Sequence, residues 1–261
     1  MPGCWGIANR DSTLSILMFL FRIVETLRPR AWVMENVPAL QGYVQSLSPP
    51  AGLRWADITR RVLNSADFGV PQRRFRFLAG QFPPPRPSHC SEEAGITPEP
   101  TDMALRPWRS MREVMDHLPS PLSQPAGLVI DPTYGIRILA RNLGDHYYST
   151  LLTPKQVERS RALKTHHKWC GRMRFPDNLD SPARTILATQ IPSARETTVI
   201  GCLVGGFQQY RCLTVRECAA IQTFPIDYKF RGKSVTDRLR LVGNAVPPLL
   251  ANAIAGAIKE S

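Results

Sequence analysis

The sequence contains no closely paired cysteines, and its most strongly apolar run is too short to cross a membrane. Its six cysteines, at positions 4, 90, 170, 202, 212 and 218, form no CxxC pair and lack the spacing of a small disulfide-rich domain. This favours a reducing cytosolic or nuclear setting over secretion. The most apolar run, residues 14–21, falls short of the roughly 20 residues that a bilayer requires. It also has no small-residue cleavage site, so we expect a core helix and no membrane association.

Acidic residues are also scarce relative to basic ones. The chain has 21 Asp and Glu against 33 Lys and Arg, which gives a formal net charge of +12. An excess of this size favours a polyanionic partner, either a nucleic acid or a phosphorylated ligand, and does not choose between them. With 261 residues, of which 43% are hydrophobic, the chain can fold as one large domain or two smaller ones.

The stretch Ala31–Pro38 is a short apolar run that ends in Glu35 and Asn36. Such a run is typical of a strand that is buried on both faces, and Pro38 disfavours helix at the residue before it. The preceding residues 12–28 predict an apolar helix, so helix and strand together indicate an α/β fold. Glu35 would then lie at the carboxyl end of the strand, where open α/β sheets bind ligands. Alternatively, it is simply an exposed acid in a turn.

Two further elements follow before a change in composition. Apolar residues recur at helical spacing over residues 54–64, with charged residues between them, which predicts an amphipathic helix. The basic loop Gln72–Arg74 then leads into a strand that begins at Phe75. A proline-rich run at residues 83–87 marks a domain boundary. Residues 88–205 are rich in proline and show no regular spacing of apolar residues, which indicates a small irregular domain.

Regular structure returns near Tyr210. The sequence Thr214-Val-Arg-Glu217 is a capping box, because the threonine and the glutamate can each satisfy the other's free backbone amide. It predicts a helix to Gln222. A last helix is predicted from Pro247 to Lys259, directly after Gly243-Asn-Ala-Val.

Four stretches, in this order, resemble the second half of the cytosine-C5 DNA methyltransferase family. They are Glu35–Val37 (the family's motif VI), Gln72–Arg76 (motif VIII), Arg211–Pro225 (motif IX) and Gly243–Pro248 (motif X). The resemblance runs from about residue 7 to the end. It implies part of a Rossmann-like α/β methyltransferase sheet with a second, small target-recognition domain. The expected divisions are residues 1–82 (catalytic part), 83–205 (target recognition) and 206–261 (a return to the catalytic part).

The resemblance also implies a reaction and assigns residues to it. The family transfers a methyl group from S-adenosylmethionine to C5 of a cytosine that has been flipped out of double-stranded DNA. A thiolate adds to C6, and an acid protonates or hydrogen-bonds N3; Glu35 matches that acid. Arg76 matches the residue that binds the base O2, with Arg74 nearby, and a guanidinium suits both positions. Asn244, Ala245 and Val246 match residues beside the cofactor.

Parts of the family pattern are missing from the sequence. There is no glycine-bearing cofactor loop, no acid for the ribose and no Pro-Cys nucleophile at the expected spacing. Cys4 lies two residues from the position that the match requires, so it is a doubtful nucleophile or an ordinary free thiol. The lost sheet strands would leave an exposed edge and uncovered apolar faces. The chain is therefore expected to be truncated, mis-started or one subunit of a split enzyme with an upstream methyltransferase subunit as its partner.

Several alternatives remain open. The arginines of residues 73–76 could form a solvated basic turn, and Asn244 could be only a turn residue. His166, His167 and Cys170 lack a second pair of ligands at metal-site spacing, so we expect no metal. The chain could be a non-catalytic DNA-binding remnant or a tRNA cytosine-C5 methyltransferase. Restriction–modification and a cytoplasmic, nucleoid-associated location are expected for a bacterial source, and a nuclear location for a eukaryotic one.

Overall fold

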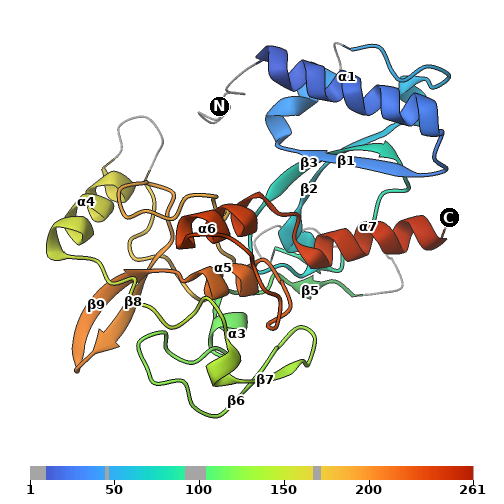
Figure 1. The fold of residues 1–261 in the computed structure, drawn as a ribbon. Helices are drawn as coiled ribbons and strands as arrows, with labels where there is room; N and C mark the ends of the chain where they lie inside the picture. Colours follow the sequence, from blue (N-terminus) through green and yellow to red (C-terminus); the bar gives the residue numbers. More distant parts are fainter. Residues whose placement is uncertain (1–9, 45–46, 92–103, 167–171, 261) are drawn as a thin grey trace. The chain divides into compact units, whose positions relative to one another are not determined.

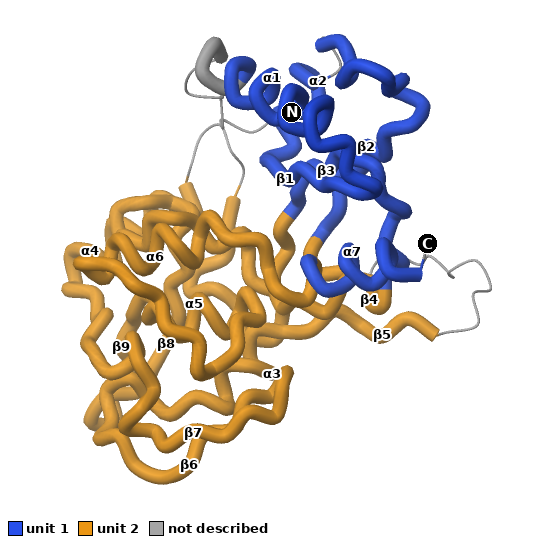
Figure 2. The backbone as a smooth tube through the Cα atoms, turned by 45° about the vertical axis from the view of Figure 1, so that its right-hand side comes forward, with its two compact units in different colours: residues 1–64, 75–87, 251–261 blue, residues 65–74, 88–250 orange. Residues whose placement is uncertain are grey.

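The computed structural model describes residues 10–44, 47–91, 104–166 and 172–260 (Figure 1). The chain divides into two compact units (Figure 2). Unit 1 comprises residues 1–64, 75–87 and 251–261, and unit 2 comprises residues 65–74 and 88–250. The sequence predicts a different kind of division, into a catalytic part and a part that recognises DNA. Because that division concerns DNA binding, it stays a prediction.

Unit 1 contains a three-stranded antiparallel sheet in the order β1-β3-β2. Its elements are α1 (Arg10–Leu27), β1 (Trp32–Asn36), α2 (Gln41–Val44), β2 (Thr59–Asn64), β3 (Phe75–Gln81) and the end of α7 (Pro248–Glu260). Met34, Phe77 and Ala79 pack with Leu17 of α1 in one apolar cluster. Helix α1 and the end of α7 lie on opposite sides of the strands (Figures 1 and 2). The predicted helix at 12–28 and the strands at 31–35 and 75–79 are confirmed.

The helix predicted over residues 54–64 is wrong. Trp55–Asp57 form one 3₁₀ turn, at whose start the Asp57 carboxylate accepts from the Arg54 backbone amide at 2.9 Å. Thr59–Asn64 form strand β2. The spacing of Trp55 and Ile58 imitates a helix because a 3₁₀ turn also repeats every three residues. Beyond Ile58, pairing with β3 determines the conformation.

Strand β1 is less covered than the sequence predicts. Met34 is buried, but the other four residues of the strand are only half-buried. In the described part of the chain β1 pairs with β3 alone, so its other edge carries unpaired backbone groups.

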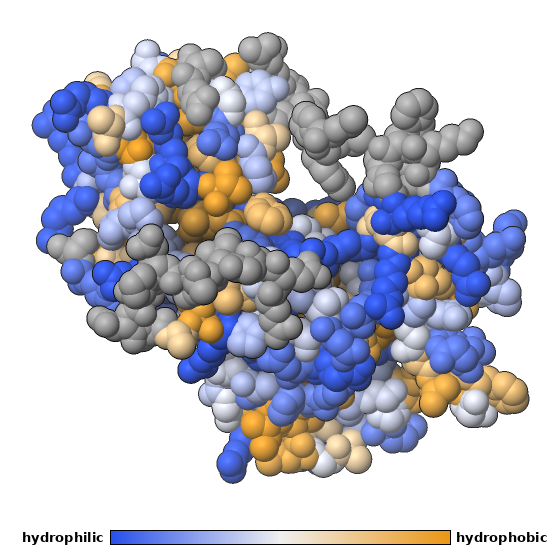
Figure 3. All heavy atoms as spheres, turned by 180° about the vertical axis from the view of Figure 1, so that it is seen from behind, coloured by the Kyte–Doolittle hydropathy of each residue, from blue (hydrophilic) through white to orange (hydrophobic). Residues whose placement is uncertain are grey.

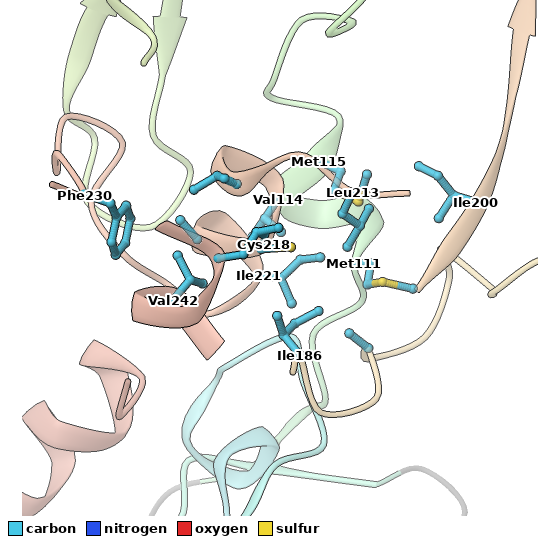
Figure 4. Packing of buried hydrophobic residues seen from close by; sticks show 14 residues of the cluster. Met111, Val114, Met115, Ile186, Ile200, Leu213, Cys218, Ile221, Phe230 and Val242 are labelled. Carbon is cyan, nitrogen blue, oxygen red and sulfur yellow. The ribbon is translucent and has the colours of Figure 1, made fainter. Parts of the chain in front are cut away.

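Unit 2 is built from short elements around one main core. They are β4 (His89–Cys90), β5 (Arg106–Pro107), α3 (Arg112–Met115), β6 (Leu128–Ile130), β7 (Arg137–Leu139), α4 (Pro154–Thr165), β8 (Val199–Val204), β9 (Phe207–Cys212), α5 (Val215–Ile221) and α6 (Val235–Asn244). Figure 4 shows that side chains from α3, α5, α6 and β8 converge in the main core. Residues far apart in the sequence therefore share this core, as Met111, Ile186 and Val242 do.

Capping boxes open three helices of unit 2. Thr214 accepts from the Glu217 backbone amide at the start of α5, as the sequence predicts. Thr153 with Gln156 opens α4, and Ser234 with Asp237 opens α6. The sequence interpretation missed α4, although Thr153-Pro-Lys-Gln156 carries both the capping box and a proline suited to the first turn.

The stretch Val235–Glu260 is long and apolar enough to cross a membrane by composition alone. The structure breaks it into two helices, because α6 ends at Asn244 and α7 begins at Pro248. Each is shorter than the roughly 20 residues of a membrane-spanning helix. The expectation of no membrane association stays a prediction.

His146 supports the start of α5 from a buried position, with 1% of its surface exposed. Its Nε2–H donates to the Pro119 carbonyl at 2.6 Å, so Nδ1 accepts from the Thr214 hydroxyl at 3.1 Å. Burial lowers the pKa of His146, and the bond to Pro119 partly offsets this. The neutral ring is therefore the form that the fold stabilises.

We expect the unfolding free energy to fall as the pH drops through about 6.5, the ordinary pKa of histidine. The unfolded chain then takes up a proton that the folded chain resists, which favours unfolding. Urea unfolding of the wild type and of His146→Gln between neutral and mildly acidic pH measures this. The variant should lose less stability on acidification, whereas His117→Gln, at an exposed position, should behave as the wild type. Equal pH dependence in all three proteins would contradict the assignment.

Candidate active site

Glu35 and Arg76 form an ion pair on one face of the unit 1 sheet. Glu35 lies opposite Leu78 in the β1–β3 register, and Arg76 is two residues before Leu78 on the same strand. Alternate residues share a face, so the two side chains are diagonal neighbours, a separation that long side chains can span. Arg76 Nε lies 2.7 Å from Glu35 Oε1. The structure thus brings together two residues that the sequence assigned to one site.

The pair is sheltered but open to solvent. The side chain of Arg76 is 13% exposed and that of Glu35 is 24% exposed. Burial lowers the pKa of Arg76, while the neighbouring Glu35 carboxylate acts in the opposite direction. Arg76 also donates through Nη1 to the Phe75 carbonyl at 2.8 Å, which fixes the plane of the guanidinium. The arrangement presents a carboxyl group and an oriented cation side by side, as recognition of a polar heterocycle requires.

Arg74 has a different environment from the one expected. It is fully buried in unit 2, where Nη1 donates to the Ile186 carbonyl at 3.2 Å. Its Nη2 donates to the carbonyls of Gly243 and Ala245 at 2.8 and 3.0 Å. The Nη donors of Arg74 are thus used by backbone carbonyls, which does not fit the predicted place of this guanidinium near the base. Arg74 instead holds the end of α6 and the segment around Ile186 in place.

Gln72 adds to this arrangement, and the sequence interpretation gave it no role. Its Oε1 accepts from the Ile186 backbone amide at 3.1 Å, and its own backbone bridges Ala183. Arg73 N donates to the Ala183 carbonyl at 2.8 Å, and Ala183 N donates to the Pro71 carbonyl at 3.0 Å. The available signal was the alternation of Gln72 and Arg74, which places two long polar side chains on one side of an extended loop.

The end of α6 lies directly against this segment. A Cβ atom on Gly243 would stand 2.3 Å from the Ala188 backbone nitrogen, so only glycine fits. The next residue, Asn244, is exposed, and Ala245 and Val246 are half-buried. The three residues predicted to lie beside the cofactor therefore form one short segment that Gly243 and Arg74 fix in position.

The remaining predicted residues are not tested by these contacts. Cys4 lies outside the described residues, as do His167 and Cys170. Within the described ranges no group of three or more His, Cys, Asp or Glu side chains is arranged to hold a metal ion. The sequence prediction of no metal stays a prediction.

The family model for C-5 cytosine-specific DNA methylases matches residues 7–260. The chain belongs to this family. Glu35, Arg76 and Asn244–Val246 all lie within the matched residues. The resemblance seen in the sequence is confirmed as membership of this family.

Individual relatives agree with the family match. The Type II methyltransferase M1.HphI of Haemophilus parahaemolyticus is 29% identical over 260 residues, which cover 91% of this chain and 58% of that protein. M.NgoPII of Neisseria gonorrhoeae is 28% identical over 96% of the chain and 71% of that protein. The chain thus spans little more than half of the Haemophilus relative.

A solved structure shows the same fold. A DNA modification methyltransferase encoded within an E. coli prophage superposes with a TM-score of 0.58 and 18% identity. The alignment covers 99% of this chain and 77% of that one. The predicted α/β methyltransferase fold is confirmed by this likeness.

Proposed function

We propose that this chain is the base-binding part of a DNA (cytosine-5-)-methyltransferase, and that Glu35 and Arg76 hold the target cytosine. The observation that carries the proposal is the 2.7 Å pair between these two residues, both of which lie within the residues that the family model matches. The net charge of +12 suits a DNA substrate. A location with the DNA follows, in the nucleoid of a bacterium or the nucleus of a eukaryote.

Each residue of the pair has a defined task. Attack of a thiolate on C6 moves electron density toward N3, and the Glu35 carboxyl group holds the proton at N3 that neutralises it. In the described part of the chain Nη2 of Arg76 makes no hydrogen bond, so it is available to donate to the base O2. A cation at O2 stabilises the same developing charge.

The residues present fit one side of a methyl-donor site. Asn244 offers an exposed amide beside the half-buried Ala245 and Val246, on a segment that Arg74 immobilises. An amide can hydrogen-bond the polar groups of S-adenosylmethionine, and the two apolar residues can contact its less polar part. When bound, S-adenosylmethionine supplies the methyl group.

The direct test is methyl transfer from labelled S-adenosylmethionine. The purified chain is mixed with the polypeptide encoded immediately upstream, or is extended to include it, and DNA and tRNA are compared as acceptors. We expect label on cytosine C5 in DNA. Label in tRNA alone would assign the chain to RNA methylation. No label with either acceptor, in either form, would refute the proposal.

Helix α1 carries an exposed apolar stripe that suits the binding of such a polypeptide. Ile16, Phe19, Ile23 and Leu27 recur at helical spacing along α1 and are 69%, 66%, 39% and 70% exposed. Leu17, on another face of the same helix, is buried in unit 1. We infer that this exposed stripe, together with the open edge of β1, binds the part of the catalytic domain that carries the nucleophile and the cofactor loop. The match covers 58% of the Haemophilus relative, so that relative contains a part with no counterpart in this chain.

We expect Ile16→Ser with Phe19→Ser to weaken this association by about 100-fold or more. Burial of a large apolar side chain is worth about 1.5–3 kcal/mol, and about 1.4 kcal/mol corresponds to a factor of ten in affinity. Titration of the upstream polypeptide, followed by calorimetry, measures the effect. Arg22→Ser, at an exposed position of the same helix, is the matched control. Equal affinity of the double variant and the control would contradict the assignment of this face.

A further inference from the structure

Strands β8 and β9 form a hairpin with a tight glycine turn. They pair in register from Val199 opposite Cys212 to Val204 opposite Phe207. Gly205 and Gly206 make the turn, with φ of 58° and 81°. Two left-handed residues in a two-residue loop match the right-handed twist of the strands, which gives a rigid turn. The hairpin end is therefore a defined shape.

The base of this hairpin is fixed in unit 2. Val199 and Cys212 are buried in a cluster with Leu152, and Ile200 belongs to the main core. Arg211 forms a buried ion pair with Glu217, with 2.6 Å between Nη2 and Oε1. The base cannot shift without disturbing both clusters, so the end of the hairpin keeps its position relative to unit 2.

The end of the hairpin is apolar on both of its faces. Leu203 and Phe207 are each 73% exposed, more than any other large hydrophobic residue that the structure describes. The register places Val204 beside Phe207 on one face, whereas Leu203 points to the other face opposite Gln208. A partner with a flat surface could cover only one of these faces. A partner into which the hairpin end inserts, such as a stack of planar groups, covers both faces.

Positive charge flanks the hairpin. The segment from Val199 to Cys212 contains no acidic residue. Helix α4, whose Val157 packs with the base of the hairpin, exposes Lys155, Arg159 and Arg161 and only one acid, Glu158. An apolar end beside basic side chains complements a molecule with charged phosphates outside and stacked apolar bases inside.

On the face of the molecule drawn in Figure 3, apolar residues (orange) lie among hydrophilic ones (blue). A second exposed group lies on the β6–β7 hairpin, where Leu128 and Leu139 are 56% and 42% exposed. That pair provides an internal control, because it has similar chemistry in the same unit. Leu128 and Leu139 are opposite each other in the register, so both side chains lie on one face of that hairpin.

We propose that Leu203 and Phe207 are an intercalating wedge that enters a base step of duplex DNA and bends it, while α4 binds the neighbouring phosphates. The ligand class rests on the proposed function, but the wedge does not depend on methyl transfer. Apolar side chains of this kind unstack base steps and kink the duplex in other DNA-binding proteins. The wedge would therefore contribute affinity and distortion without reading sequence.

The test measures binding and bending of a short DNA duplex that carries a fluorophore pair at its ends, without methyl donor. We expect Leu203→Ser with Phe207→Ser to weaken binding at least tenfold and to abolish the change in energy transfer, with an unchanged salt dependence. Lys155→Gln with Arg159→Gln should instead reduce the salt slope by about two, since each phosphate contact contributes about one. Leu128→Ser with Leu139→Ser should match the wild type.

Other results would overturn the wedge. The wedge is refuted if the Leu203/Phe207 variant binds and bends DNA as the wild type does, or if the Leu128/Leu139 control loses as much binding. It is also refuted if the wild type binds no duplex, or if the hairpin end mediates self-association and the variant's DNA binding is unchanged. Methylation is scored separately. Wedge-dependent bending without methylation refutes only the proposed reaction, and methylation with wedge-independent bending refutes only the wedge.

Discussion

Glu35→Gln is expected to lower methyl transfer by the completed enzyme about 10²–10⁴-fold, the usual contribution of a general acid. Glutamine keeps the size and hydrogen-bonding reach of the side chain but has no acidic proton for N3. The ion pair with Arg76 is also lost, although Arg76 keeps its bond to the Phe75 carbonyl. Because base and DNA contacts remain, the effect should fall on kcat more than on the KM for DNA. Steady-state kinetics with labelled S-adenosylmethionine separate the two.

The matched control is Glu113→Gln. Glu113 also pairs with an arginine, Arg109, at 3.4 Å, but its side chain is 51% exposed. Surface pairs of this kind contribute little to stability, so both variants should fold. If Glu35→Gln turned over at the wild-type rate, Glu35 would not be the proton donor. If Glu113→Gln lost the same activity, the effect would reflect general disturbance of charge.

Arg74→Met is expected to destabilise unit 2 by about 3–5 kcal/mol and to lower its melting temperature by about 10 °C. Methionine fills much of the volume but donates no hydrogen bond, so the carbonyls of Ile186, Gly243 and Ala245 lose a buried donor. Leaving such groups unsatisfied costs more than the bond itself is worth on average. The stability of Arg74→Lys should lie between those of the wild type and Arg74→Met, because an ammonium group cannot reproduce the planar fork of donors. Calorimetry of the purified variants measures the shifts.

Arg73→Met controls for loss of an arginine at this loop. Arg73 is exposed, and its hydrogen bonds to Ala183 and Thr185 are made by backbone atoms. It should change stability by no more than about 0.5 kcal/mol. A melting temperature of Arg74→Met equal to that of Arg73→Met would show that the buried contacts are not what stabilises unit 2.

Local sequence signals predicted the elements that carry the proposed site. The apolar run before Glu35 and the alternation after Phe75 indicated β1 and β3, and those two strands alone determine that Glu35 and Arg76 meet. The Thr214–Glu217 capping box predicted α5 for a similar reason. In each case the decisive interactions lie within a few residues or between two recognisable strands.

Other features depend on partners that no local pattern reveals. Arg74 and Arg76 look alike in the sequence, yet one is enclosed by backbone carbonyls and the other faces a carboxylate, because distant segments decide their surroundings. Residues 59–64 became a strand through pairing with β3, against their helical spacing. The sequence predicted α1 to be buried, yet the stripe of Ile16, Phe19, Ile23 and Leu27 is exposed in the described part of the chain.

The contacts of Arg74 also bear on how the protein is made. Its carbonyl partners lie 112, 169 and 171 residues later in the chain. At a synthesis rate of about 5–20 residues per second, roughly 10–30 seconds separate the synthesis of Arg74 from that of its last carbonyl partner. Unit 2 therefore cannot close around this cation until the ribosome has added Ala245. A product that stops before Gly243 would leave the arginine without two of its three acceptors, so premature termination should yield a chain that quality-control proteases degrade.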